Sequence, residues 1–250
     1  MILDFLNGTL FQNLKSEKPI ISLSIVACLL LIAKDYFGSA FQIYPILSFL
    51  GCKDLLHLFN HSADAHFYKQ LYWLLGCYLF YLIIPIGFKA FGKTKLSEIG
   101  WKLNIPKKHI SVYLFLAIII LPVIIIAATT ERFQNTYPFF KFNPAFHSWQ
   151  QFILWETGYM LQFVAVEFFF RGFLLFGFAR FIGPSAVYVA LIPYCMIHFG
   201  KPLPETIGAI IAGIVLGKMA LASKSIFPGI LIHCMVGCLM DCLSIYHKFY

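Results

Sequence analysis

Charged side chains are scarce in this 250-residue sequence. Only 12% of the residues are Asp, Glu, Lys or Arg, whereas 60% are hydrophobic. An ordinary soluble domain carries about 25% charged residues, most of them on its surface. A chain with so little charge has no means of keeping a globular surface in water, so a soluble globular domain is excluded.

Two motif classes are also missing. The seven cysteines include no CxxC spacing and lie mostly inside apolar runs, so they predict no disulfide framework. No HExxH pattern is present either, and with it the helix that holds zinc in one large class of metalloproteases is absent.

Acidic residues are fewer than basic ones, 11 against 19. A basic excess can indicate nucleic-acid binding, but the lysines here fall in the loops between apolar runs and form no single stripe, so we expect no nucleic-acid partner. Six of them lie between Lys89 and Lys108, where Glu98 is the only acid. This bias predicts that the 89–108 loop faces the cytoplasm.

What the sequence does contain is long apolar runs. The runs at 71–88 and 110–130 have no charge and are long enough to cross a bilayer. A third run, 148–179, carries charges that must face protein or water rather than lipid. Three more apolar runs follow, and in the one at 206–217 the GxxxG spacing of Gly213 and Gly217 indicates close helix packing.

The number of spans depends on the first 51 residues. Apolar runs at 20–33 and 36–51 are separated only by Lys34 and Asp35, so the region is one span with a re-entrant piece or two spans. We therefore predict an all-α, polytopic transmembrane helix bundle of about seven to eight spans, which forms a single integral membrane domain over residues 1–250. The side of the N-terminus follows from the count and stays open.

Four ionisable side chains inside the spans are candidate site residues. A charge at the centre of a membrane helix costs about 2.5–3.5 kcal/mol on insertion scales and is a functional-site hypothesis by default. Glu167 and Arg171 are four residues apart and share a helix face, while His198 and His233 belong to two later segments. Brought together, one carboxylate and two imidazoles can activate a water molecule.

Structural readings of the same residues are also open. Arg171 can simply neutralise Glu167 for insertion, and single histidines in apolar helices are commonly hydrogen-bonded core residues. Glu156 lies on the same helix face as Glu167 but about 16 Å from it along the axis, so we expect an interfacial or capping charge there.

At these positions the sequence resembles the CPBP intramembrane proteases, a family that includes the glutamate-dependent CAAX prenyl endopeptidases, the bacterial Abi-type proteins and myxosortase-like enzymes. The family carries EExxxR, then an aromatic-xxx-His, then His-xxx-Asn or Asp, on successive membrane helices. This chain has Glu167 with Arg171, Tyr194 with His198, and His233, in that order.

Two further segments extend the resemblance. Residues 198–205, HFGKPLPE, are similar to a bacterial variant of the second motif, and Lys201 can pair with Glu205 across one helical turn. Residues 96–101, LSEIGW, resemble a piece that precedes the family's core, so the core extends over about 96–245. Val166 stands at the first glutamate of EExxxR and Gly237 at the Asn or Asp, with Asp241 about 6 Å further along the helix.

The resemblance implies an intramembrane endopeptidase that cleaves a membrane-associated protein or peptide by glutamate-activated water. Glu167 is then the general base, Arg171 orients it, and His198 and His233 position water and stabilise the oxyanion. No cofactor is required; if a metal is bound, it is zinc on Glu167, His198 and His233. The expected setting is the lipid bilayer of a bacterial plasma (inner) membrane.

Two alternatives from other classes stay open. Val166 and Gly237 favour a catalytically inactive relative that acts as a membrane binding or immunity module. A small-solute transporter, with the buried charges as a proton relay, is disfavoured because no internal repeat is evident.

Overall fold

The computed structural model describes residues 14–103 and 105–249; residues 1–13, 104 and 250 of the predicted domain lie outside it. Its α-helices are, in chain order, α2 (Leu14–Phe37), α3 (Ala40–Phe49), α4 (Lys53–Asn60), α5 (Ala65–Tyr78), α6 (Ile84–Phe91), α7 (Lys107–Ala128), α8 (Glu131–Thr136), α9 (Trp149–Glu167), α10 (Phe176–Ile182), α11 (Ala186–Met196), α12 (Leu203–Ser223) and α13 (Phe227–Phe249). Two π-helical segments, η1 (Leu79–Ile83) and η3 (Phe168–Leu175), and two 3₁₀ turns, η2 (Leu96–Ile99) and η4 (Gly183–Ser185), complete the elements.

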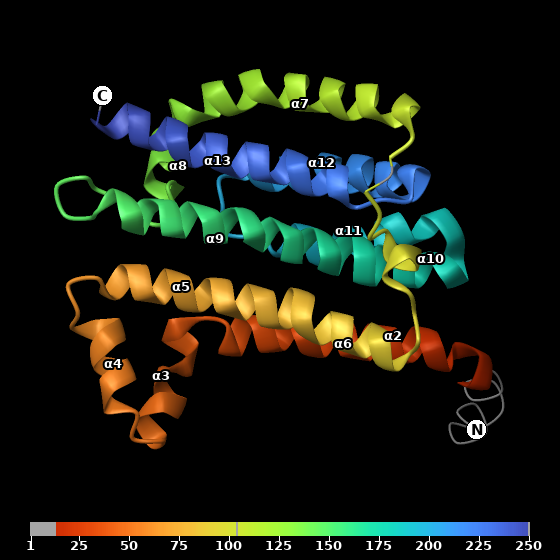
Figure 1. Ribbon diagram of the computed structural model, residues 1–250, viewed down its shortest axis with the longest axis horizontal. Coiled ribbons are helices and arrows are strands. Elements are labelled where there is room, and N and C mark those ends of the chain that lie inside the picture. Colours follow the sequence, from red (N-terminus) through yellow and green to blue (C-terminus); the bar gives the residue numbers. More distant parts are fainter. Residues whose placement is uncertain (1–13, 104, 250) are drawn as a thin grey trace, which may run out of the picture.

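The long helices form one bundle, in which they run side by side (Figure 1). Six helical stretches among the described residues are long and apolar enough to cross a membrane: Lys18–Phe37, Ala65–Phe91, His109–Ala128, Trp149–Met196, Leu203–Ser223 and Phe227–Phe249. The predicted all-α, polytopic bundle is confirmed.

The number of spans differs from the predicted seven to eight in two places. The second apolar run of the N-terminal region forms α3, which has only 10 residues and lies across the direction of the long helices together with α4 (Figure 1). The 48-residue stretch Trp149–Met196 reverses at η4, where Gly183 has a φ of +60°, so that α11 packs back against η3. With 11 residues, α11 is too short to cross a bilayer alone.

Helix α9, which carries the candidate site, begins at a capping box. The Ser148 hydroxyl accepts the backbone N–H of Gln151, and the Gln151 side chain accepts the backbone N–H of Ser148. Two of the free N–H groups of the first turn are thereby satisfied. The Gln151 amide also donates to Asp64 at 2.9 Å, which ties the start of α9 to the start of α5.

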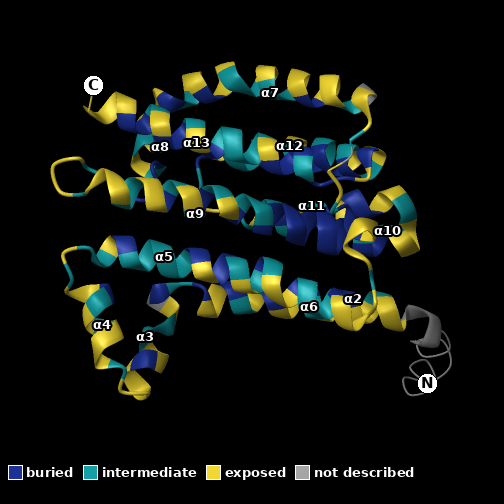
Figure 2. Ribbon diagram, viewed as in Figure 1, coloured by how far each residue is buried: buried dark blue, intermediate teal, exposed yellow. Residues whose placement is uncertain are grey.

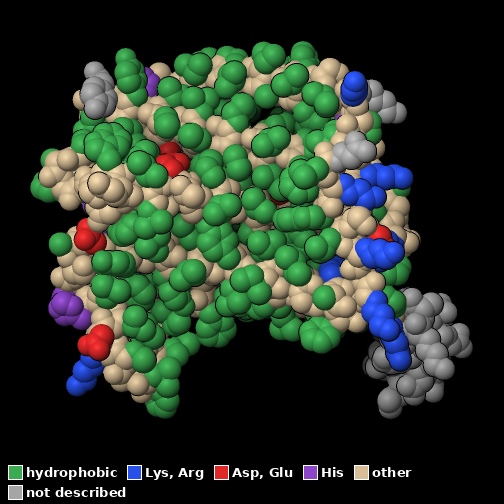
Figure 3. All heavy atoms as spheres, in the orientation of Figure 1, with side chains coloured by type: hydrophobic (Ala, Val, Ile, Leu, Met, Phe, Trp, Pro, Cys, Tyr) green, Lys and Arg blue, Asp and Glu red, His purple; other side chains and the backbone are tan. Residues whose placement is uncertain are grey.

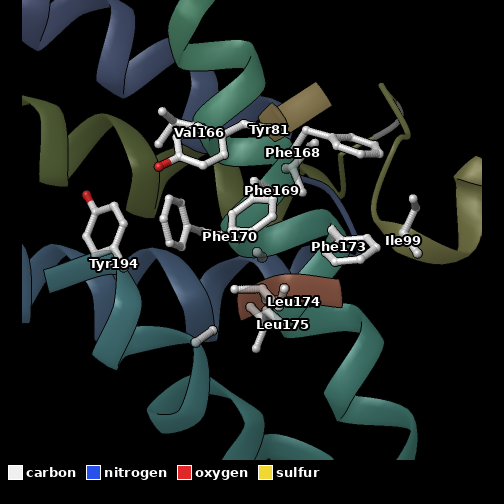
Figure 4. Close-up of a cluster of buried hydrophobic side chains, with 14 of the residues drawn as sticks. Tyr81, Ile99, Val166, Phe168, Phe169, Phe170, Phe173, Leu174, Leu175 and Tyr194 are labelled. Atoms are coloured by element: carbon white, nitrogen blue, oxygen red, sulfur yellow. The ribbon is translucent and has the colours of Figure 1, made fainter. Parts of the chain in front are cut away.

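The core of the bundle lies around η3. Figure 2 shows the dark blue of buried residues concentrated where α9 passes into α10 and meets α11, whereas α7 is largely exposed. Figure 4 shows the phenylalanine side chains of η3 packed with Tyr81 and Tyr194, and the Tyr81 and Phe169 rings stack at 4.8 Å between centroids. In an isolated soluble chain the exposed leucine and isoleucine side chains of α7 would be unfavourable, but toward lipid they are in their preferred medium.

Charge is distributed unevenly over the bundle. In Figure 3 most of the visible Lys and Arg side chains gather at one end, and hydrophobic side chains cover the middle. This end includes the 89–108 loop, which the lysine bias assigns to the cytoplasm; that side stays a prediction.

The LSEIGW segment supports η3 from outside. Ile99 is fully buried, and the Gly100 carbonyl accepts the Ile226 backbone N–H just before α13 at 2.9 Å. The Trp101 ring meets the edges of Phe168 and Phe227. The segment therefore fixes the π-helix against the start of α13.

Gly100 is the strained point of this segment. Its φ is +81°, in the left-handed region, and a Cβ at this position would collide with the Phe176 ring. We expect Gly100→Ala to lower the free energy of unfolding by about 1–3 kcal/mol, because the backbone and the ring cannot both keep their positions. The control is Gly208→Ala in α12, where a Cβ meets nothing within 4 Å. Thermal unfolding in detergent measures both; equal melting temperatures for the two variants would contradict the expectation.

Candidate functional site

Glu167 and Arg171 lie at the junction between α9 and η3. Glu167 is the last residue of α9, and the wider π-helical turn begins at Phe168, immediately after it. Segments of π-helix are rare and occur frequently at functional sites. Both side chains are buried, with 1% and 3% of their surfaces exposed, so neither faces lipid.

The Glu167 carboxylate is held between two cationic or polar partners. Its Oε1 atom lies 2.9 Å from Nη1 of Arg171 and 2.7 Å from Nδ1 of His233 on α13. These distances are those of ion pairs, although the angles do not meet hydrogen-bond geometry. On the other side Gly229 packs so closely that a Cβ there would lie 2.6 Å from Oε2. Glu167 therefore faces α13 and is enclosed.

Val166 points into the hydrophobic core. It is 4% exposed and belongs to the cluster that contains Tyr81 and Phe170 (Figure 4). Adjacent residues of a helix point about 100° apart, so only one of the positions 166 and 167 can face His233. In this chain that position is 167, the one that carries the carboxylate.

Tyr194 joins the two histidines. Its hydroxyl lies 3.0 Å from Nε2 of His233, and its backbone carbonyl lies 2.8 Å from Nδ1 of His198. The guanidinium of Arg171 lies over the Tyr194 ring, 4.0 Å from its centroid. The sequence offered Tyr194 only as the aromatic of the second motif, whereas the structure makes it the link between η3, α11 and α13.

The four predicted site residues therefore form a chain rather than a ring. Glu167 contacts Arg171 and His233 directly, and His198 connects to them only through Tyr194. Within the described residues no contact joins Glu167 to His198. The structure brings all four together, but it places no common position between the carboxylate and both imidazoles.

His198 lies in the turn between α11 and α12 and is neutral. Burial, followed by the nearby charge of Lys201, lowers the pKa of His198 to about 3. Because the partner of Nδ1 is a carbonyl, Nδ1 carries the proton and donates it. The lone pair of Nε2 is then available to accept a hydrogen bond from water or substrate.

Neighbouring side chains fix the turn that carries His198. The Thr206 hydroxyl donates to the His198 carbonyl at 2.9 Å. The predicted pair of Lys201 and Glu205 is confirmed, at 2.8 Å, and the Tyr137 hydroxyl donates to the same carboxylate at 2.6 Å. Burial, with the charge of Glu205 among the lesser causes, raises the pKa of Tyr137 well above its usual value, so the phenol stays a donor. Sequence reasoning missed Tyr137, since only an aromatic run marked its segment.

Gly237 permits close packing of α13 on α9. A Cβ at this position would lie 2.5 Å from Cε2 of Phe163, and the Phe163 ring stacks on His233 at 5.5 Å between centroids. The place where the family motif has Asn or Asp is therefore filled by an aromatic ring. Asp241 is no substitute, because it is fully buried against Glu156, further along α13.

A small cavity adjoins the site. It measures about 10 Å³, which is room for about one water molecule. Its lining includes Arg171 and Tyr194, together with Gly213 and Gly217 of α12. A Cβ at Gly213 would lie 2.5 Å from a Leu191 methyl group, which confirms the close helix approach predicted from the GxxxG spacing.

The arrangement does not suit zinc. Across the described part of the chain, no three His, Cys, Asp or Glu side chains form a group that could hold a metal ion. The one carboxylate oxygen that faces His233 already contacts the cationic Arg171, and among the described residues no contact brings His198 to this carboxylate. The zinc alternative stays a prediction that metal analysis of the purified protein can check.

Comparison with known families agrees with this site. Residues 148–239 match the family described as type II CAAX prenyl endopeptidase Rce1-like. This match supports the assignment of the segment 148–239 to the CPBP family. All of the predicted site residues lie inside the matched segment, in the order of the family motifs. Searches of curated proteins and of solved structures gave no match.

Replacement of His198 tests its neutral state. A histidine whose folded pKa is lowered stabilises the fold above its unfolded pKa of about 6.5 and loses that contribution as pH falls toward 3. We expect the wild-type folded-to-unfolded ratio to fall by up to about tenfold per pH unit in this window. His198→Asn keeps a donor for the Tyr194 carbonyl and should flatten this dependence, whereas the exposed His247→Asn should leave it unchanged. Melting temperatures between pH 4 and 7 decide the matter.

Gly237→Asn tests the packing of α13 on α9. The change restores a polar residue of the family motif, but the new side chain collides with Phe163, so we expect a loss of about 1–3 kcal/mol in unfolding free energy. The double variant Gly237→Asn with Phe163→Ala should be more stable than the sum of the two single changes implies. Strict additivity, measured by thermal unfolding, would contradict the contact.

Proposed function

We propose that this chain is an intramembrane endopeptidase of the CAAX-protease type, which hydrolyses a peptide bond in a membrane-associated protein or peptide. The observation that carries the proposal is the contact of Glu167 with His233, at 2.7 Å, inside the segment that matches the family. A buried carboxylate that holds an imidazole is the arrangement by which hydrolases prepare a general base.

The contacts favour a revised role for Glu167. Its carboxylate is enclosed by Arg171, His233 and Gly229, so it acts on water through His233 rather than directly. The negative charge keeps the proton of His233 on Nδ1 and leaves Nε2 as the acceptor, toward which the Tyr194 hydroxyl points. Arg171 keeps Glu167 ionised in a medium of low dielectric constant.

Hydrolysis then proceeds by one proton cycle. As the water oxygen bonds to the scissile carbonyl carbon, its proton passes to the Tyr194 hydroxyl, whose own proton moves to Nε2 of His233. The imidazolium that forms is stabilised by Glu167. Collapse of the tetrahedral intermediate breaks the C–N bond, and the proton returns by the same path to the leaving amine. His198, through its free Nε2, orients the water or the substrate carbonyl group.

The substrate class follows the family's description. A prenylated CaaX peptide is therefore the first probe to test, since its lipid chain lies in the bilayer and its peptide end reaches the bundle. Other membrane-associated substrates can be found by adding the protein to a membrane extract and mapping the new chain termini that cleavage creates.

The decisive experiment uses the full chain in liposomes with a fluorogenic farnesylated CaaX peptide and, in parallel, the membrane extract. We expect Glu167→Gln, His233→Gln and His198→Gln to lower kcat/KM by about 10²–10⁴-fold, the usual worth of general acid–base groups. The control is Cys238→Ala, an exposed position on α13, which should keep full activity. Thermal unfolding verifies that each variant is folded; a folded Glu167→Gln variant with wild-type activity would overturn the assignment.

A second candidate has its own support. Val166 in place of the first motif glutamate, and a cavity with room for one water only, favour a catalytically silent relative that binds a peptide or another membrane protein. In that case the same peptide would bind with equal affinity to wild type and Glu167→Gln, and neither protein would release product or create new termini.

A further inference from the structure

A second pair of ionisable side chains lies between α9 and α13. The carboxyl groups of Glu156 and Asp241 lie within hydrogen-bonding reach of each other, and Asp241 has no exposed surface. The pair is about 16 Å along α9 from Glu167 and contacts none of the predicted site residues. Glu156 does not cap α9, whose N-cap is Ser148, and its partner is another acid; an interfacial position of Glu156 stays a prediction.

The oxygens of this pair lack donors. As two carboxylates, Glu156 and Asp241 present four buried oxygen atoms, none of which has an aligned hydrogen-bond donor among the described residues. Two N–H groups, of the Trp155 indole and the Phe139 backbone, do face Asp241. Burial of one unpaired carboxylate is already costly, and two in contact also repel each other. A proton or a metal cation must therefore lie between the two carboxyl groups.

The two nearby lysine side chains do not neutralise the pair. Lys141 donates to the carbonyl groups of Asn135 and Thr136, and Lys248 donates to that of Tyr137. Neither lysine forms an ion pair with Glu156 or Asp241 within the described ranges. Five titratable or charged groups from the neighbouring segments face the pair: Tyr137, Lys141, Tyr159, Cys242 and Lys248.

We propose that Glu156 and Asp241 bind a single proton between them at neutral pH, and that this shared proton clamps α9 to α13. Glu156 carries the proton and donates it to Asp241, since Asp241 is the acid that the two N–H groups face. The O–H···O⁻ bond formed in this way is of the strong, charge-assisted kind. It leaves one negative charge, which the Trp155 and Phe139 donors stabilise.

The clamp affects the Glu167–His233 site because both lie on the same two helices. Helices α9 and α13 carry Glu167 and His233 as well, so the spacing set by the shared proton is also the spacing at which the Glu167–His233 contact forms. An effect of the clamp on peptide hydrolysis rests on the proposed function, whereas the proton and its effect on stability do not.

The direction of the pH effect follows from the proton count. In the unfolded chain both carboxyl groups are ionised at neutral pH, whereas the folded chain keeps one proton. The stability that the pair contributes is therefore greatest near the unfolded carboxyl pKa of about 4 and falls as pH rises through the titration of the pair, by up to about tenfold in the folded-to-unfolded ratio per pH unit.

Infrared spectroscopy of the full chain in lipid tests the proton directly. We expect wild type at pH 7 to show the carbonyl band of a protonated carboxylic acid in a buried setting. This band should disappear in Glu156→Gln, whose amide keeps the size of the side chain and donates to Asp241 without a titrating proton. The exposed Glu98→Gln is the control and should keep the band; an unchanged spectrum in Glu156→Gln would overturn the proposal.

Thermal unfolding tests the clamp. The melting temperature of wild type should fall between pH 6 and 9, and Glu156→Gln should remove most of this fall, while Glu98→Gln should follow wild type. Asp241→Asn serves as the second variant if Glu156→Gln does not fold, and its pH dependence should be flattened in the same way. If the melting temperature of a folded clamp variant depended on pH as steeply as that of wild type, the proposal would be refuted. So would stabilisation by Ca²⁺ at constant pH that Glu156→Gln abolishes, because a metal ion would then occupy the place of the proton.

Discussion

The charge of Arg171 is the constraint around which this bundle is organised. A guanidinium inside a membrane protein must have a counter-ion, since its transfer into a medium of low dielectric constant is otherwise prohibitive. Glu167 supplies that counter-ion from the same helix, one turn away, at 2.9 Å. The same carboxylate oxygen reaches His233, so the neutralisation of one charge also joins η3 to α13.

Aromatic packing holds this ion pair in place. The π-helix that follows Glu167 is fully buried, and its phenylalanine rings fill the space between α6, α11 and the LSEIGW segment (Figure 4). Ring edges and faces allow tight packing around a charged group without any further polar contact. The positions of Glu167 and Arg171 are therefore set by hydrophobic side chains, and the ion pair alone would not determine them.

Much of this arrangement could be predicted from the sequence. Low charge and long apolar runs were sufficient for the helical bundle, because in lipid only helices or closed barrels satisfy the backbone. The spacing of Glu167 and Arg171 predicted their contact, since residues four apart share a helix face. The order of the motifs was sufficient to suggest the family, and the match of residues 148–239 supports that assignment.

What could not be predicted depends on contacts between distant residues. The sequence left open whether the run at 36–51 crosses the bilayer, and nothing in it indicated that α11 would stop after 11 residues. The link through Tyr194, the support from Tyr137 and the meeting of Glu156 with Asp241 all join segments more than 35 residues apart. A pattern along one helix shows which residues share a face, but not which face of another helix they meet.

The short length of α11 has a consequence for the lipid environment. Eleven residues of helix rise about 16 Å, roughly half of the hydrocarbon core of a bilayer. If η4 lies at the membrane surface, the non-helical turn after α11, which carries His198, lies near mid-membrane depth. Irregular backbone is stable at that depth only where it borders protein or an aqueous space. The His198 carbonyl meets this condition through protein, since it accepts the Thr206 hydroxyl of α12, so the bundle itself shields part of this turn from lipid.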